Sequence, residues 1–465
     1  MDQEKAILRE LLMQLAGRVR TVITEGSFEP ALKSVTRLRF SGFRYEQDGP
    51  KCDGGWLEDT QEAEWPQSVS DAIMNSVLGT DEYEAAAAAV SKCPGGQKNL
   101  EHLESFTGGV LSGMLTSQSV KHELPSDFIR FLYGEPQQHT LTAQLDGLLI
   151  SCQEMESSHG GNSFVLRQAT QEDAELVLKP FHTYKDRVSP APAILKIVAS
   201  AHNNVPAEMQ DLLEKSVVIL RLFGCGSVAY RSYTMKLSLF TFPGVHCVYS
   251  PHDALSAPYK YRIGDQDMKR LIAFWTTTYE KIPEMLYSVN AKEGHYLRIA
   301  YERFSEAILS NRPCEYRIMM ASMALESLFL LENYQGELNY RLTTFAAKVL
   351  GLLGLDPIRV RKRLKTAYNY RSKYVHGGQL SPKQREKAWE NESIDLFTRT
   401  VLDYVRICLL AFICLNGRKS KAELTEVIDS SLISQEAHEQ LQDLLAEVKE
   451  TLELCLFSQQ LFEEI

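Results

Sequence analysis

The sequence lacks the features that mark secreted, membrane-spanning and disulfide-stapled proteins. Its nine cysteines include no Cys-x-x-Cys pair, so neither a disulfide framework nor a zinc ribbon is indicated. The longest apolar run, from Ile407 to Leu415, is far shorter than the roughly 20 residues needed to span a bilayer. The acidic, amphipathic N-terminus is unlike a secretory signal. We therefore expect a cytoplasmic protein without a membrane segment.

Positive charge is also in short supply. The chain has 50 Lys and Arg against 60 Asp and Glu, a formal net charge of −10, which disfavours broad affinity for nucleic acids or anionic membranes. A nucleic-acid site would therefore have to be a local basic surface. Hydrophobic residues make up 44% and charged residues 24% of the sequence, as in ordinary folded proteins. A chain of 465 residues is expected to form more than one domain.

The patterning predicts an α+β protein of several domains. Residues 1–139 begin with an amphipathic helix over about 2–24 and otherwise allow no fold assignment, and "DGPKCDGGW" at 48–56 has the composition of a loop. A β-containing domain is expected over 140–260. Segments there with the alternation or β-branched content of strands are 140–151, 162–170, 174–181, 193–200 and 235–242.

The C-terminal half is expected to be helical. From about residue 265 onward, apolar residues recur at three- and four-residue spacings, which is typical of amphipathic helices. The segments 296–309 and 357–376 are two of the helices that this spacing predicts. Short joints containing Gly, Pro or Asn separate these segments. We expect an all-α helical bundle over 261–416, followed by an acidic helical extension over 417–465.

The segment "TAYNYRSKYVHGG" at 366–378 places Arg371 five residues before His376 and two glycines. Such a spacing occurs by chance in roughly every second protein of this length, and a histidine before glycine is also an ordinary helix end. Residues five apart on a helix point about 140° away from each other. The two side chains can therefore converge on one phosphate only if the last turn unwinds, which the two glycines permit.

The residues around this pair favour a role in RNA binding. Basic side chains alternate with tyrosines over 359–374, a pattern that suits single-stranded RNA, although a charge run is more often a solvated face. The RNA-binding candidates are Arg361, Arg363, Lys365, Tyr368 and Tyr370. Candidate supporting residues are Ser372, Lys373 and Tyr374; Ser372 lies one turn before His376 and could orient its ring.

The helix expected over 315–334 carries a carboxylate in an apolar stripe. Glu326 shares a face with Met319, Met323 and Leu330, and a carboxylate in that position is costly unless it is paired. Arg371 or Lys373 is the expected partner if this helix packs beside the motif segment. The alternative is that Glu326 faces solvent at the edge of the bundle.

Three segments resemble the Apea-like branch of the HEPN superfamily, the higher-eukaryote and prokaryote nucleotide-binding domains. They are "VVILRLFGCGSV" at 217–228, "ALESLFL" at 324–330 and "YNYRSKYVHGG" at 368–378. The similarity covers about residues 210–415. Arg371 and His376 match the family's Arg-x4–6-His motif. Ser372 stands where the family often has Asn, and Gly378 replaces the tyrosine that is modified in one toxin branch.

The resemblance implies a helical bundle that cuts RNA without a metal or another cofactor, at a composite cleft between two copies of the chain. Arg371 and His376 would be the catalytic residues, with Glu326 among those that support them. Many family members act in anti-phage defence or as toxins. The resemblance also implies an RNA partner, with transfer RNA as one candidate substrate, and a homodimer or a higher homo-oligomer.

Two other functions stay open. The bundle could be catalytically inactive and serve as a dimerisation module, or as a nucleotide or RNA sensor in a regulatory protein. Alternatively, a metal-dependent hydrolase could be built on His246 and Cys247, with Cys225 and His252 nearby, although their spacing fits no known metal-ligand pattern. Cleavage of RNA in the presence of a chelator would separate the nuclease from both.

Overall fold

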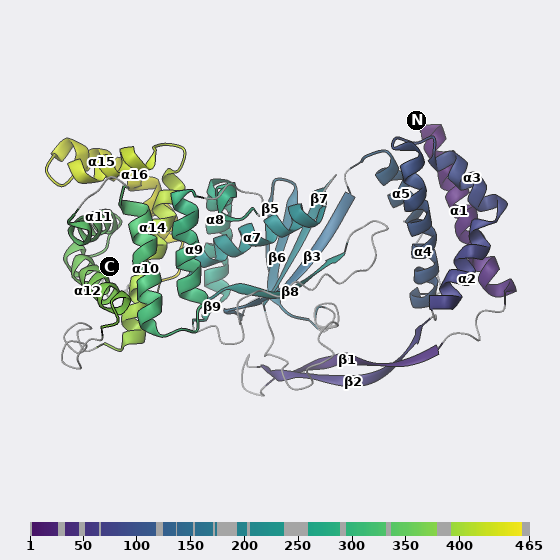
Figure 1. The fold of residues 1–465 in the computed structure, drawn as a ribbon, viewed down its shortest axis with the longest axis horizontal. Helices are drawn as coiled ribbons and strands as arrows, with labels where there is room; N and C mark the ends of the chain where they lie inside the picture. Colours follow the sequence, from purple (N-terminus) through teal and green to yellow (C-terminus); the bar gives the residue numbers. More distant parts are fainter. Residues whose placement is uncertain are drawn as a thin grey trace.

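A computed structural model of the chain describes residues 2–26, 33–45, 52–64, 67–117, 124–135, 137–151, 154–170, 173, 193–201, 205–236, 259–288, 294–331, 336–378 and 392–457. Its elements follow one another along the longest axis of the molecule. A helical unit stands at the N-terminal end, a sheet lies in the middle, and a helical bundle forms the other end (Figure 1).

The first group, called the N-terminal helical unit from here on, has a core of its own among the described residues. It comprises α1 (Asp2–Glu25), α2 (Gln67–Leu78), α3 (Asp81–Val90), the 3₁₀ turn η2 (Gly96–Lys98), α4 (Asn99–Ser117) and α5 (Leu124–Leu132). The predicted apolar stripe of α1 supplies Leu8, Leu12 and Leu15 to this core, because residues three and four apart share a helix face.

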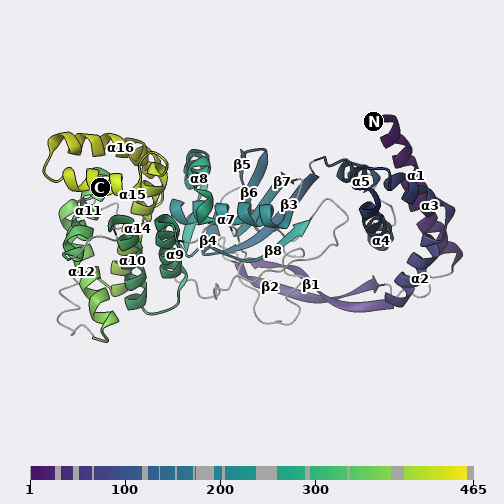
Figure 2. The same cartoon turned by 45° about the horizontal axis from the view of Figure 1, so that its top comes forward.

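A long two-stranded ribbon accompanies the helical unit. β1 (Lys33–Tyr45) and β2 (Cys52–Glu64) pair antiparallel, with Lys33 opposite Glu64. In Figures 1 and 2 the ribbon runs beneath the other elements, from the N-terminal helical unit toward the sheet. The loop predicted at 48–56 is therefore wrong for the part from Cys52 to Trp56, which belongs to β2.

The sheet is antiparallel, with the strand order β5–β6–β7–β3–β8. Its strands are β3 (Gln137–Asp146), β5 (Met155–His159), β6 (Asn162–Gln168), β7 (Ala193–Ala201) and β8 (Ala229–Lys236). β5 and β6 form a hairpin closed by Gly160 and Gly161, whose φ angles of 58° and 80° suit the two-residue turns that match strand twist. Beside it, β4 (Leu148–Ile150) pairs parallel with β9 (Tyr261–Ile263).

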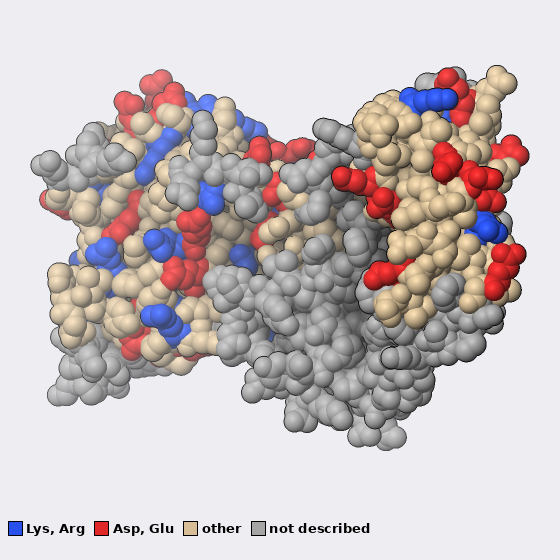
Figure 3. Space-filling view, turned by 45° about the vertical axis from the view of Figure 1, so that its right-hand side comes forward, with Lys and Arg blue, Asp and Glu red and all other residues tan. Residues whose placement is uncertain are grey.

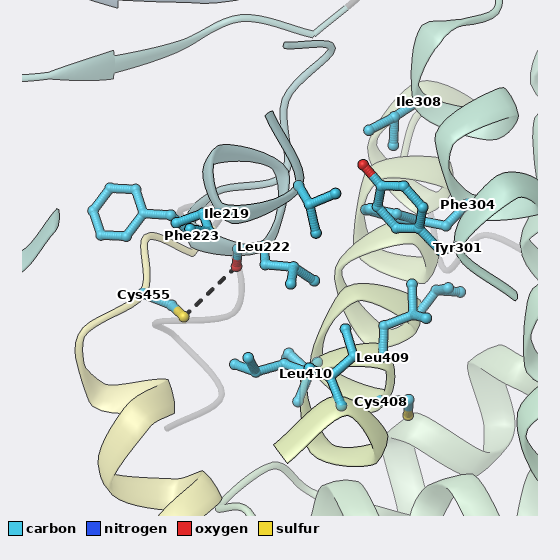
Figure 4. Close-up of a cluster of buried hydrophobic side chains, with 14 of the residues drawn as sticks. Ile219, Leu222, Phe223, Tyr301, Phe304, Ile308, Cys408, Leu409, Leu410 and Cys455 are labelled. Carbon is cyan, nitrogen blue, oxygen red and sulfur yellow. Dashed lines mark hydrogen bonds between the residues drawn. The ribbon is translucent and has the colours of Figure 1, made fainter. Parts of the chain in front are cut away.

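A continuous hydrophobic core joins the sheet to the C-terminal helices. Helix α7 (Val205–Phe223) packs against the sheet, as Figure 2 shows. On the bundle side, Phe164 of β6 contacts Trp275 of α8 (Asp265–Thr278), with ring centroids 5.4 Å apart. Figure 4 shows the apolar side chains at this junction, where the Cys455 thiol donates to the Leu222 carbonyl at 3.7 Å. The sheet and the bundle therefore share one core.

The remaining helices form a bundle, and one of them is buried in its middle. They are α9 (Tyr296–Leu309), α10 (Cys314–Phe329), α11 (Leu338–Leu352), α12 (Pro357–Val375), α14 (Ile394–Leu415), α15 (Lys421–Ser430) and α16 (Gln435–Glu453), with the 3₁₀ turns η5 (Tyr279–Lys281) and η6 (Glu284–Leu286) after α8. Nearly all of α14 from Phe397 onward is buried. A helix that is apolar on all sides takes the middle of a bundle, as α14 does here.

A buried arginine fixes the junction of α7, α14 and the segment after α16. Arg406 and Asp403 of α14 have no exposed side-chain area, and Arg406 Nε donates to Asp403 Oδ1 at 2.9 Å. The same guanidinium donates to the carbonyl oxygens of Leu222, Phe223 and Leu456 at 2.7, 3.2 and 2.9 Å. Arg406 thus satisfies carbonyl groups at the end of α7 that have no partner within that helix.

The predicted α+β class with a helical C-terminal half is confirmed, and the structure shows that the sheet is antiparallel. The helix expected at 296–309 and the strands expected at 162–170 and 193–200 occur at those positions. The strand predicted at 174–181 lies outside the described residues. Within the described part of the chain, no helix combines the length and the apolar character required to cross a bilayer.

Candidate functional site

The motif segment forms the regular helix α12, and its start is set by local sequence. The Asp356 carboxylate accepts hydrogen bonds from the backbone N–H groups of Ile358 and Arg359 at 2.9 and 3.4 Å. Pro357 occupies the first turn, where its missing N–H leaves no hydrogen bond unmade. Asp and Pro at these two positions are a typical helix start, so α12 begins where the sequence predicts.

The two glycines close α12 in a Schellman motif. Gly377 has a φ of 72°, a left-handed conformation that glycine adopts without a steric penalty. Its N–H donates to the Tyr374 carbonyl at 3.1 Å, and the Gly378 N–H donates to the Lys373 carbonyl at 2.8 Å. These bonds satisfy the last carbonyl groups of the helix. The glycines therefore end α12 rather than loosen it.

The last turn of α12 does not unwind, so Arg371 and His376 diverge. The His376 N–H still donates to the Ser372 carbonyl at 3.3 Å, one full turn back. On a wound helix, residues five apart point about 140° away from each other. A single described chain therefore does not bring the guanidinium and the imidazole onto one phosphate.

Arg371 is held against α10 by Glu326, and this arginine is one of the two partners that the sequence predicts for the carboxylate. Arg371 Nη2 donates to Glu326 Oε2 at 3.3 Å, and the Arg371 and Glu326 side chains are 27% and 22% exposed. The guanidinium carbon lies 5.7 Å from the ring centroid of Tyr368. Arg371 Nε is buried and has no hydrogen-bond partner among the described residues. This nitrogen is enclosed by the protein, so a ligand would have to meet the part of the Arg371 side chain that remains exposed.

The Glu326 carboxylate is in an unfavourable environment that its neighbours offset only in part. Burial raises the pKa of Glu326, whereas Arg371 and a hydrogen bond from Tyr368 lower it, with a net upward shift. Burial also raises the pKa of the Tyr368 hydroxyl, as does the nearby Glu326 charge. The three side chains form one connected group, called the Glu326 cluster below, which fixes the position of Arg371.

His376 lies on an exposed face of α12 together with basic side chains. We define the basic stripe as Arg361, Lys362, Lys365 and His376, all of which are exposed. With 3.6 residues per turn, these positions fall within about 100° of one another around the helix. The Arg361 guanidinium lies 5.1 Å from the ring centroid of Tyr340, a residue of α11 that is 56% exposed. The stripe thus combines positive charge with an accessible aromatic ring.

Two predicted RNA-binding residues are buried. Arg363 is 3% exposed and pairs with Glu392. Tyr370 is 4% exposed, and its hydroxyl donates to Glu315 Oε1 at 2.9 Å. Both side chains face the interior of the bundle because they follow the same helical spacing as the apolar residues of α12. Their burial argues against the RNA contact predicted for them and removes them from the candidate surface.

The remaining predicted residues lie near the end of α12, and none of their side chains hydrogen-bonds to the His376 ring in the described part of the chain. Tyr374 is exposed, whereas Ser372 and Lys373 are half-buried. No hydrogen bond joins the Ser372 hydroxyl to the His376 ring among the described residues. Sequence reasoning did not single out Glu315 and Glu392, the carboxylates that hold Tyr370 and Arg363. Nothing in their local sequence indicates those pairings.

The surface charge differs between the two ends of the molecule. Acidic side chains predominate on the visible face of the N-terminal helical unit, while basic and acidic groups are interspersed on the bundle (Figure 3). Exposed carboxylates of that unit include Glu4, Glu10, Glu25, Asp71, Asp81, Glu84, Glu101 and Glu104. A polyanion is therefore repelled from the N-terminal end, and the basic stripe is the better docking surface.

The residues of the alternative metal site lie largely outside the described structure. His246, Cys247 and His252 are not among the described residues. Cys225 is described, and burial raises the pKa of its thiol, which disfavours the thiolate form that binds metals. Within the described ranges, no group of three or more His, Cys, Asp or Glu side chains is arranged to hold a metal ion.

Comparison of the chain with protein-family models, with curated proteins and with solved structures gives no match. The functional assignment therefore rests on the side chains of α10 and α12. The most distinctive features there are the Glu326 cluster, with its unsatisfied arginine donor, and the basic stripe that ends at His376.

Proposed function

We propose that this protein is a metal-independent endoribonuclease of the HEPN type, in which Arg371 and His376 act on the scissile phosphodiester. The observation that carries the proposal is the pairing of two features on one helix. Arg371 is positioned by Glu326 yet its side chain stays partly exposed, and His376 is exposed at the end of a basic stripe. One feature supplies an anchored donor for a phosphate, and the other supplies an accessible proton-transfer group.

RNA carries its own nucleophile, so few protein groups are needed. The 2′-hydroxyl oxygen attacks the adjacent phosphorus while its proton passes to a histidine. The P–O5′ bond then breaks, and the leaving oxygen takes a proton from a second donor, giving a 2′,3′-cyclic phosphate and a 5′-hydroxyl. Histidine suits the proton transfers, which contribute typically 10²–10⁴-fold. An arginine suits the charge on the phosphorane oxygens, where one donor is worth on the order of 10²–10³-fold.

The divergence of Arg371 and His376 favours a site shared by two copies of the chain. Across a two-fold axis, the arginine of one copy can meet the histidine of the other without unwinding α12. Two histidines would also provide both the base and the acid. Apolar groups near this helix end are unusually exposed, with Val375 at 52% and Tyr374 at 39%. Such side chains are enriched where proteins associate.

An RNase of this kind would serve as an anti-phage or toxin effector in the cytoplasm, with transfer RNA as one candidate substrate. Because an unrestrained RNase harms its own cell, its activity must be held in check. The acidic N-terminal helical unit is the region we assign to that role, since its charge opposes RNA binding.

A second candidate function is a catalytically inactive dimerisation or sensing module. The observation that favours it is the engagement of Arg371 with Glu326 and Tyr368 in the described chain. An arginine committed to such a cluster would stabilise the bundle instead of binding phosphate. This candidate predicts RNA or nucleotide binding without cleavage.

The deciding experiment is incubation of the purified full chain with end-labelled RNA in EDTA. We expect cleavage that leaves cyclic phosphate ends, reduced at least about 100-fold in both Arg371→Ala and His376→Ala. Arg130→Ala, which replaces an exposed arginine of α5, is the matched control and should cleave like the wild type. Binding without cleavage by the wild-type protein would support the inactive module, and activity that EDTA abolishes would contradict both.

A further inference from the structure

Lys215 is buried beside a cavity where the sheet meets the bundle. The cavity has a volume of about 290 Å³ and is lined from β6, β7, α7, η5 and η6. Lys215 is only 8% exposed. Its Nζ lies 3.7 Å from the ring centroid of Tyr279 and 5.4 Å from that of Tyr287. It makes no hydrogen bond or ion pair with any described residue.

An ammonium group at the end of a largely buried side chain, without an oxygen partner, is unusual. The two tyrosine rings offset part of its desolvation through cation–π contacts, but they accept none of its three N–H donors. Burial lowers the pKa of Lys215, although the nearby Glu280 raises it. An anionic group placed in the cavity would therefore gain a charge-assisted hydrogen bond that the protein itself does not use.

The same cavity carries the opposite charge nearer to solvent. Glu208 and Asp211 from the first turns of α7, and Glu284 from η6, also line it. Glu208 and Glu284 are exposed, and Asp211 is half-buried. The cavity is thus lined by one largely buried cation, by three carboxylates nearer to solvent and by the rings of Tyr279 and Tyr287. A simple anion would be repelled at the opening, and a simple cation would leave Lys215 unpaired.

We propose that this cavity binds a small zwitterion, namely a free α-amino acid or a close analogue. Its carboxylate would pair with Lys215, and its ammonium group would lie among Glu208, Asp211 and Glu284. The volume suits a ligand smaller than the drug-sized molecules held by pockets of about 300–1,000 Å³. Because carboxylates outnumber the lysine, amino acids with a basic side chain should bind most tightly. The site is remote from α12, and the inference stands whether or not the protein cuts RNA.

The test is isothermal titration calorimetry of the full chain with each of the twenty standard amino acids. For the tightest binder, the methyl ester removes the carboxylate charge and the N-acetyl derivative removes the ammonium charge. Each should lower the affinity by about tenfold or more, since a charge-assisted contact is lost. If none of the twenty binds, or if either derivative binds as well as the parent amino acid, the proposal is overturned.

Variants tie the binding to these residues. Lys215→Met keeps the length of the side chain and should abolish binding, whereas Lys269→Met, at an exposed position of α8, should leave it unchanged. Lys215→Met could fail to fold because its site is buried. Glu208 is exposed, so Glu208→Gln should leave the fold intact, and it should still weaken binding several-fold. Unaltered affinity in Glu208→Gln together with Glu284→Gln, or in a folded Lys215→Met, would refute the assignment.

Discussion

Arg406 at the α7–α14 junction and Arg371 near the end of α12 show two different uses of a guanidinium group. Arg406 has no exposed area, and each of its three nitrogens donates within the fold, to Asp403 and to backbone carbonyls. Arg371 is 27% exposed, makes a 3.3 Å bond to Glu326 and keeps an unpartnered Nε. An arginine whose donors are all used within the fold is structural, whereas one that stays partly exposed beside a single ion pair can bind a ligand.

Two further residues at and just after the end of α7, Arg221 and Gly226, make close contacts near this junction. Arg221 Nε donates to the Val228 carbonyl at 2.8 Å, and its NH1 donates to the Tyr301 hydroxyl at 3.1 Å. A Cβ on Gly226 would lie 2.3 Å from the Tyr261 ring, so only glycine fits there. The segment 217–228, which contributes to the family resemblance, is thus explained by packing. Of the three segments that carry the resemblance, the one at the end of α12 keeps an arginine whose side chain is still partly exposed.

The largest expected effect separates the two arginines by stability. Arg406→Met should lower the free energy of unfolding of the sheet and bundle by about 3–5 kcal/mol, because it strands a buried carboxylate and several carbonyl groups. Arg371→Met should cost less than about 1 kcal/mol, since its ion pair is partly exposed. Hydrogen exchange of peptides from α7 and α14 measures both. Equal losses in the two variants would show that Arg371 is also structural.

The separate cores determine how that measurement is made. The N-terminal helical unit has its own core among the described residues, while the sheet and the bundle share one. Denaturant unfolding followed by a single probe would therefore mix two transitions. Exchange resolved by peptide isolates the region around Arg406, and peptides of α1 serve as the internal control.

The second prediction tests whether the α12 end works alone or in pairs. Arg371→Ala and His376→Ala should each lose at least about 100-fold of RNA cleavage. When the two variants are mixed and allowed to exchange subunits, a shared site regains one intact arginine and one intact histidine. We therefore expect cleavage well above that of either variant alone. No gain on mixing, with exchange verified by native mass spectrometry, would place the complete site within one chain.

The helices of the bundle could be predicted because their patterns are local. Apolar spacing and Gly, Pro or Asn joints place α9 and α12 within a residue or so of their observed ends. Glu326 could also be found, because a carboxylate on an apolar face needs a partner. The same signal was present in α14, where Asp403 and Arg406 stand in an otherwise apolar helix, and it indicates a buried ion pair.

Other features could not be predicted, for identifiable physical reasons. The glycine-rich start of β2 is typical of a loop, and only pairing with β1 makes it a strand. A run of basic and aromatic residues does not show which of them face outward. The inward face of α12 is marked by Val360 and Leu364, which are buried, and Arg363 lies on that same face. The Lys215 cavity depends on elements far apart in sequence, which no local pattern brings together.

The third prediction concerns pH and the Glu326 cluster. Burial raises the pKa of Glu326 above its unfolded value, with Arg371 and Tyr368 opposing the shift. The folded state therefore holds this proton more tightly. Its contribution to stability is complete below the unfolded pKa and is lost as the pH rises through the folded pKa. Glu326→Gln should remove this decline. Hydrogen exchange of peptides from α10 and α12, followed from acidic to neutral pH, measures the stability of this part of the fold; the same pH dependence in both proteins would contradict the shift.

The smallest expected effect concerns the backbone that presents His376. Gly377→Ala forces an L-residue to a φ of 72° and should cost about 1 kcal/mol. Gly378→Ala is the matched control, because its φ is not in the left-handed region and its Cβ would meet the Lys373 carbonyl oxygen at 3.4 Å. Since the Schellman bonds fix the last turn of α12, Gly377→Ala should also slow RNA cleavage several-fold through a displaced His376, while Gly378→Ala changes it less. Thermal unfolding and cleavage rates measure the two effects. If Gly377→Ala lowers stability without slowing cleavage, the helix end holds the bundle together but does not position the histidine.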